Sequence, residues 1–118
     1  MLWYRSATGT VEEVMLEGMP LGYTTSPRYD QREIALSPGD TMLLMSDGLP
    51  ERLNPNEEEF GYQRVETLFA ELAPTHPPDR ICQQLMRGGE EWAAGRAQDD
   101  DITFVVLRAK TPISVEEA

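Results

Sequence analysis

The chain has 118 residues, enough for one small domain, and its 40% hydrophobic content is sufficient for a single core. Its 21 acidic residues outnumber 10 basic ones, which gives a formal net charge of −11. Because no basic stripe is available to release counterions from a phosphate backbone, the composition argues against a nucleic acid partner.

The single cysteine, Cys82, excludes an internal disulfide and a multi-cysteine zinc site, and it agrees with a reducing compartment. No stretch reaches the ~18 apolar residues of a spanning helix, and the first residues lack the basic and then apolar pattern of a signal peptide. We therefore expect a soluble, cytoplasmic protein that has no membrane partner.

The beginning of the chain predicts a β-hairpin. Residues 2–5 and 11–16 have strand character and flank residues 6–10, whose composition is typical of a hairpin loop. Residues 17–27 follow as a loop.

A second hairpin is predicted next. Residues 31–36 alternate in polarity, and the turn Ser37-Pro38-Gly39-Asp40 leads into an apolar run over residues 41–46. We expect residues 31–36 and 41–46 to pair.

The middle of the chain predicts an amphipathic helix between Gln63 and Ala73, closed by Pro74. Four apolar residues at positions i, i+3, i+4 and i+7 form its buried stripe. They are Val65, Leu68, Phe69 and Leu72.

A second helix is predicted to begin at Pro77 and Pro78, which suit a first helical turn. Gly88 and Gly89 weaken it, at about 1 kcal/mol for each glycine. Its expected buried side consists of Ile81, Cys82, Leu85, Met86 and Trp92.

Two acidic segments each lie at one end of an apolar strand. Asp47 follows residues 41–46, and Asp99 to Asp101 precede the last predicted strand, residues 102–107. If these strands lie side by side and antiparallel, the end of the first and the start of the second share one edge of the sheet. The carboxylates then converge, which is how proteins hold hard divalent cations.

Five motifs occur in a characteristic order and spacing. They are Met19-Pro20-Leu21-Gly22, Leu36-Ser37-Pro38-Gly39-Asp40-Thr41-Met42-Leu43-Leu44, Ser46-Asp47-Gly48-Leu49-Pro50-Glu51, Phe60-Gly61, and Gln98-Asp99-Asp100-Asp101-Ile102-Thr103-Phe104-Val105-Val106-Leu107. Together they resemble the C-terminal half of the SpoIIE/RsbU-like branch of the metal-dependent protein phosphatases (the PPM superfamily). The resemblance covers nearly the whole chain.

The resemblance implies an α+β fold, namely the C-terminal half of a layered α-β-β-α phosphatase domain with antiparallel strands and two helices. We expect this part to occupy residues 1–108, followed by a polar tail over residues 109–118 that frays.

The resemblance also implies a hydrolase, a phosphoserine/phosphothreonine protein phosphatase with a magnesium or manganese pair. In that family the aspartate of the Ser/Thr-Asp-Gly turn is a metal ligand, which matches Asp47. A second family ligand lies two positions before the Ile-Thr pair, which matches Asp100. The alignment with the family motif can shift by one position, so Asp99 and Asp101 are also candidates. Gly48 would let the backbone turn sharply beside the first ligand.

The implied chemistry suits these residue types. Carboxylate oxygens bind hard cations, and two ions ~3.5–4 Å apart can activate a bridging water and neutralise charge on the phosphoryl oxygens. No covalent nucleophile is then needed. The branch implies a phosphorylated regulatory protein in signal transduction as the substrate, and nothing in the sequence selects one.

The expected N-terminal half, which carries further ligand aspartates, does not precede Leu2. The chain therefore resembles the back half of a larger domain, with about five strands and two helices. Two carboxylates supply too little charge for two divalent ions, so we expect an incomplete catalytic domain with little activity alone. Unpartnered strand edges predict self-association, through residues 2–5 or 11–16.

Two other interpretations stay open. The chain can be a non-catalytic pseudophosphatase or remnant that acts as a protein-binding module, or a purely structural domain whose acidic segments are ordinary turns. Dependence on a metal ion separates the phosphatase from both of these interpretations. Binding of a partner without metal separates the protein-binding module from the purely structural domain.

Overall fold

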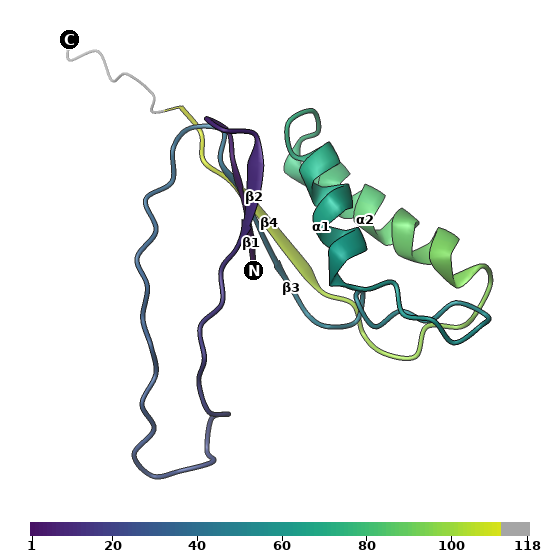
Figure 1. Ribbon diagram of the computed structural model, residues 1–118, viewed down its shortest axis with the longest axis horizontal. Coiled ribbons are helices and arrows are strands. Elements are labelled where there is room, and N and C mark those ends of the chain that lie inside the picture. Colours follow the sequence, from purple (N-terminus) through teal and green to yellow (C-terminus); the bar gives the residue numbers. More distant parts are fainter. Residues whose placement is uncertain (112–118) are drawn as a thin grey trace.

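The computed structural model describes residues 1–111, which form a four-stranded antiparallel sheet covered on one face by two helices (Figure 1). This is the α+β arrangement predicted from the sequence. Residues 112–118, most of the predicted polar tail, lie outside the described residues. The strands are β1 (Leu2–Arg5), β2 (Thr10–Glu13), β3 (Thr41–Met45) and β4 (Phe104–Arg108), in the sheet order β2-β1-β3-β4, and the helices are α1 (Tyr62–Leu72) and α2 (Pro78–Ala93).

The first predicted hairpin is confirmed. β1 and β2 pair antiparallel from Leu2 opposite Glu13 to Arg5 opposite Thr10. The second strand ends at Glu13, so residues 14–16 do not belong to it as predicted.

The second predicted hairpin is wrong, because residues 31–36 belong to no strand. β3 pairs with β1 on one side and with β4 on the other, so it has no free edge for them. The chain between β2 and β3 instead leaves the sheet and returns as two extended limbs (Figure 1), joined by one isolated bridge between Gly18 and Tyr29. The described sheet therefore has four strands rather than about five.

Both predicted helices are present. In α1, Val65, Phe69 and Leu72 are buried and Leu68 packs against the same core, as the apolar spacing predicted. In α2, Ile81 and Leu85 are fully buried. The other members of its predicted buried side, Cys82, Met86 and Trp92, are only partly buried.

Gly88 and Gly89 allow α2 to pack closely on its neighbours. A Cβ atom at Gly88 would lie 2.9 Å from Leu68 Cδ2 of α1, and one at Gly89 would lie 2.7 Å from Leu49 Cδ1. The helical propensity lost at these positions is therefore offset by closer packing. Neither described helix is both long and apolar enough to span a bilayer.

The two faces of the sheet differ because side chains alternate along each strand. Leu43 and its neighbours on the inner face join the core beneath α1 and α2. The outer face carries a small cluster of Trp3, Met42 and Val14, with Ile34 packed against it. It also carries three exposed apolar side chains, Leu44, Val105 and Leu107, which are 39%, 48% and 52% exposed.

Asp40, the residue before β3, is only 3% exposed, and its carboxylate links the beginning of β3 to β1 and to the residue that follows β1. Its Oδ1 accepts hydrogen bonds from Ser6 N and Ser6 Oγ, and its Oδ2 accepts them from Ser37 N and Trp3 Nε1, all at 2.9–3.1 Å. Burial by itself raises the pKa of Asp40, but these hydrogen bonds outweigh it and hold the pKa below its ordinary value.

We expect Asp40→Asn to lower the free energy of unfolding by about 1–3 kcal/mol at pH 7, because an amide NH2 would face backbone donors. Since the folded-state pKa of Asp40 is depressed, its stabilising effect is present above the ordinary carboxyl range and lost as pH falls through the folded-state pKa. In urea unfolding experiments from pH 7 to pH 3, the difference in free energy of unfolding between the wild type and Asp40→Asn should become smaller as the pH falls. Asp30→Asn, at an exposed loop position, is the control; a difference independent of pH would contradict the prediction.

We also expect the chain to self-associate. β1 is central and cannot pair with another chain, contrary to one of the two predicted routes; the edges at β2 and β4 and the apolar outer face remain available. Val105→Lys combined with Leu107→Lys should shift sedimentation at micromolar concentration toward the monomer. The control, Gln63→Lys with Gln83→Lys, adds the same charge at exposed helical positions and should leave the sedimentation unchanged. A compact wild-type monomer would contradict the prediction.

Candidate functional site

The two acidic segments lie at the same end of the β3–β4 pair, as predicted. The strands are antiparallel, from Thr41 opposite Arg108 to Met45 opposite Phe104. Pairing continues beyond the strands, where Ser46 N donates to Thr103 O and Thr103 N donates to Ser46 Oγ, both at 3.0 Å. The segment after β3 and the segment before β4 are therefore held side by side.

Gly48 lies where the backbones of these two segments approach closely. A Cβ atom there would lie 2.1 Å from Asp101 O and 3.0 Å from Ile102 Cγ1. Gly48 lies within a turn over residues 47–51, as predicted, but it is not among the glycines with positive φ, so the turn itself does not require a glycine. The position needs glycine because the backbone of the acidic loop occupies the space of a side chain.

The turn that carries Asp47 is anchored in the core. Leu49 is fully buried and packs at Gly89 of α2. Glu51 N donates to Asp47 O at 3.0 Å, and Arg52 N donates to Leu49 O at 3.1 Å. The Asp47 side chain itself is exposed, so a rigid base presents it to solvent.

The Asp47 carboxylate has a partner that the sequence did not reveal. The Tyr62 hydroxyl, at the first residue of α1, donates a hydrogen bond to Asp47 Oδ1. This bond, then burial and the charges of Asp47 and Glu51, raises the pKa of Tyr62 to about 12, so the phenol stays protonated as a donor at neutral pH. An aromatic residue after Phe60-Gly61 carries no local signal for such a contact.

The three aspartates before β4 have different surroundings, although all are exposed. Asp99 Oδ2 forms an ion pair with Arg96 Nε at 3.5 Å. Asp100 Oδ1 accepts a hydrogen bond from Asp101 N at 2.8 Å. Asp101 contributes its backbone oxygen to the contact with Gly48.

Arg52 is a second residue that sequence reasoning missed. It is only 9% exposed, and its Nη2 donates to Arg96 O at 2.9 Å, while Nη1 is buried without a partner among the described residues. This contact fixes the upstream end of the acidic loop. An arginine in a turn is usually solvated, so its burial could not be read from the sequence. A hollow of about 190 Å³ lies here, lined by Gly48, Glu51, Arg52, Leu53, Arg96, Asp99 and Asp100.

The candidate ligands are of the right type for a hard divalent cation, but there are too few of them to hold it alone. Asp47 and Asp100 offer the carboxylate oxygens that magnesium and manganese prefer. Within residues 1–111, however, no group of three or more His, Cys, Asp or Glu residues is arranged to hold a metal ion. Their role as ligands stays a prediction, and so do those of Asp99 and Asp101.

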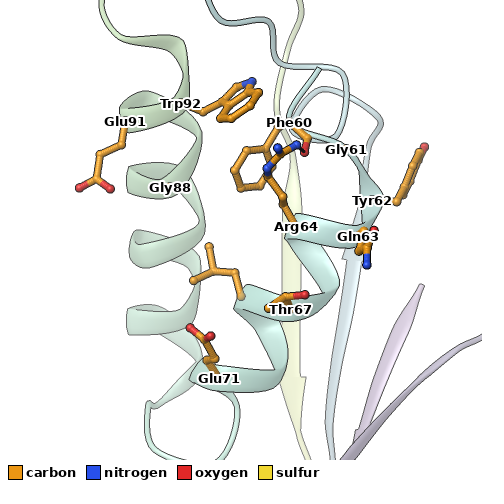
Figure 2. A pocket seen from close by; sticks show the side chains of 11 residues that line it. Phe60, Gly61, Tyr62, Gln63, Arg64, Thr67, Glu71, Gly88, Glu91 and Trp92 are labelled. Carbon is orange, nitrogen blue, oxygen red and sulfur yellow. Dashed lines mark hydrogen bonds between the residues drawn. The ribbon is translucent and has the colours of Figure 1, made fainter. Parts of the chain in front are cut away.

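A larger hollow of about 890 Å³ lies between α1 and α2 (Figure 2). The Arg64 guanidinium stacks 4.1 Å from the centre of the Trp92 ring, and Trp92 Nε1 donates to Glu58 O at 2.9 Å. In Figure 2 the Tyr62 ring points away from Trp92 and from α2. Tyr62 nevertheless belongs both to the lining of this hollow and to the contact with Asp47 at the acidic edge, by which we mean the end of the β3–β4 pair that carries Asp47 and Asp99 to Asp101. None of the candidate ligands lines the hollow.

Comparison with known proteins gives one family and one fold. The sequence model of the family described as stage II sporulation protein E (SpoIIE) matches residues 1–110. Two solved structures are similar in fold: the SiaA-PP2C domain of Pseudomonas aeruginosa, with a TM-score of 0.71 and 22% identity, and the phosphatase domain of the cell fate determinant SpoIIE from Bacillus subtilis (Mn presoaked), with 0.65 and 23%.

The chain spans less than half of either structure. The two alignments include 91% and 97% of this chain, but only 42% of the first domain and 48% of the second. Among curated protein sequences there is no significant match.

We expect Gly48→Ala to push the two acidic segments apart, because the added methyl would overlap Asp101 O. The free energy of unfolding should fall by about 1–3 kcal/mol, as for other overpacking substitutions. Amide NMR shifts of residues 99–102 should change in the remaining folded protein. In Gly18→Ala, the control, the new methyl meets only the Tyr29 side chain, at 3.1 Å in an exposed loop. Unchanged stability and unchanged shifts in Gly48→Ala would contradict the close approach.

Proposed function

This chain belongs to the SpoIIE family, and from that premise we propose that it supplies two ligand segments to a metal-dependent phosphoserine/phosphothreonine protein phosphatase. The observation that carries the proposal is the antiparallel β3–β4 register, which places Asp47 and the Asp99–Asp101 segment at one sheet edge. Two solved domains named for phosphatase or PP2C activity share the fold.

Asp47 and Asp100 are the proposed ligands. Asp99 is the weaker candidate because its carboxylate already pairs with Arg96, and Asp101 because its backbone is fixed against Gly48. Asp100 has no cationic partner among the described residues. Its carboxylate is therefore more available to a metal ion than that of Asp99, and it is preferred to Asp101 because it lies two positions before the Ile102-Thr103 pair, where the family resemblance places the ligand.

Manganese is the ion that we propose, with magnesium as the alternative. The SpoIIE domain from B. subtilis is described as presoaked with Mn, and both ions prefer carboxylate oxygens. When bound, such ions supply charge for the phosphoryl oxygens and lower the pKa of an attacking water. The chain's own residues hold the carboxylates in place: Gly48 lets the segments meet, and Arg52 fixes the loop that carries Asp100.

The proposed substrate is a phosphorylated regulatory protein, and the proposed setting is signal transduction in the cytoplasm. Both proposals rest on the family. The formal charge of −11 makes the chain by itself repel a phosphorylated group, so cations at the acidic edge would be needed to reverse the local field.

A non-catalytic, protein-binding role is the alternative. One observation favours it: residues 1–111 contain no group of three or more potential ligands around a common point. A pseudophosphatase of this kind would bind its partner equally well with and without manganese.

We expect the 118-residue chain alone to hydrolyse aryl phosphates or phosphopeptides barely or not at all with millimolar manganese, since two aspartates under-ligate a pair of ions. Adding the N-terminal part of a SpoIIE-family phosphatase domain, fused or in trans, should restore manganese-dependent turnover. Asp47→Asn or Asp100→Asn should then reduce kcat/KM by at least about 100-fold, because loss of a ligand should exceed the 10–100-fold typical of its supporting contacts.

Asp79→Asn is the matched control, since it removes one charge on α2 away from the acidic edge. Strong activity of the chain by itself would contradict the argument that two aspartates are too few ligands for a pair of ions. Restored activity that is indifferent to both substitutions would contradict the assignment of Asp47 and Asp100.

A further inference from the structure

Among residues 1–111, Tyr62 is the one side chain that forms a hydrogen bond with the carboxylate of Asp47. Its hydroxyl donates to Oδ1, and no other hydrogen bond to this carboxylate is present among residues 1–111. Within this part of the chain, Oδ2 has no hydrogen-bond donor. The two oxygens of the candidate ligand are therefore distinguished by Tyr62 before any ion binds.

The two residues are also fixed relative to each other by the backbone. Gly61 N donates to Pro50 O at 2.7 Å, and Phe60 N donates to Arg52 O at 2.9 Å. These bonds tie the beginning of α1 to the same turn that carries Asp47. The Tyr62 ring therefore starts from a rigid position beside the carboxylate rather than from a mobile loop.

Tyr62 does not have the surroundings of a core residue. The residue is 55% exposed, and its ring points away from α2 (Figure 2). Loss of its hydroxyl removes no buried polar group and leaves no cavity in the core. Core packing therefore gives no reason for a tyrosine here rather than a phenylalanine, whereas the contact with Asp47 does.

We propose that Tyr62 is a positioning residue for the metal ligand Asp47. By holding Oδ1, its hydroxyl fixes the orientation of an otherwise exposed carboxylate and leaves Oδ2 for a divalent cation. This inference rests on the proposed function, because it requires a cation at Asp47. Supporting hydrogen bonds of this kind change metal affinity by about 10–100-fold when they are removed.

The test measures Mn²⁺ binding to the full chain, not phosphatase activity. The EPR signal of free Mn²⁺ reports the bound fraction directly and does not depend on the oligomeric state. Tyr62→Phe should require about 10–100-fold more Mn²⁺ for the same occupancy. Its urea unfolding midpoint should stay at the wild-type value, as for a surface substitution. Tyr23→Phe, at a tyrosine 71% exposed in the loop after β2, should bind like the wild type.

Two aspartate variants separate failure of this inference from failure of the proposed function. Asp47→Asn should abolish the Mn²⁺ binding that Tyr62→Phe weakens, and Asp79→Asn, with the same loss of charge, should not. If Asp47→Asn reduces binding but Tyr62→Phe binds as well as the wild type or better, the role of Tyr62 is overturned and the metal site stands. If Asp47→Asn and Asp79→Asn bind like the wild type, or the wild type binds no Mn²⁺, the metal site and the role of Tyr62 are both overturned.

Discussion

The register between β3 and β4 is the constraint on which the rest of the structure depends. It places Leu43 and Val106 on the inner face beneath the helices, and it also places Ser46 opposite Thr103 at the acidic edge. Because side chains alternate along a strand, a slip of one residue would expose the core face and displace Asp100 relative to Asp47. The hydrophobic effect that selects the register therefore also sets the position of the candidate ligands.

In the candidate site, buried residues hold the backbone in place and the candidate ligands are exposed. Leu49 is buried against α2, and Arg52 is buried against the backbone of the acidic loop, whereas Asp47 and Asp100 face solvent. A buried arginine costs desolvation energy, and its hydrogen bond to Arg96 O offsets only part of that cost. Such a contact is understandable where the position of a loop matters more than stability.

The apolar outer face and the presence of only two candidate ligands at the acidic edge have a common explanation in a layered phosphatase domain. In the α-β-β-α architecture expected from the sequence, a second sheet would cover the face that carries Leu44, Val105 and Leu107 and would bring further aspartates to the same edge. The chain spans 42% and 48% of the two similar solved domains, which is consistent with one sheet and one helical layer.

The sequence alone determined the two helices, the first hairpin and the placement of Asp47 and of Asp99 to Asp101 at the same end of an antiparallel strand pair. These features depend on local periodicity and on the order of strands, which a single chain displays directly. Only the tertiary structure decided that residues 31–36 form no strand, because β3 finds both partners far away in the sequence. The same holds for Gly48, Arg52 and Tyr62. Their roles depend on which distant backbone or carboxylate each one meets, and no local pattern records a contact made across the fold.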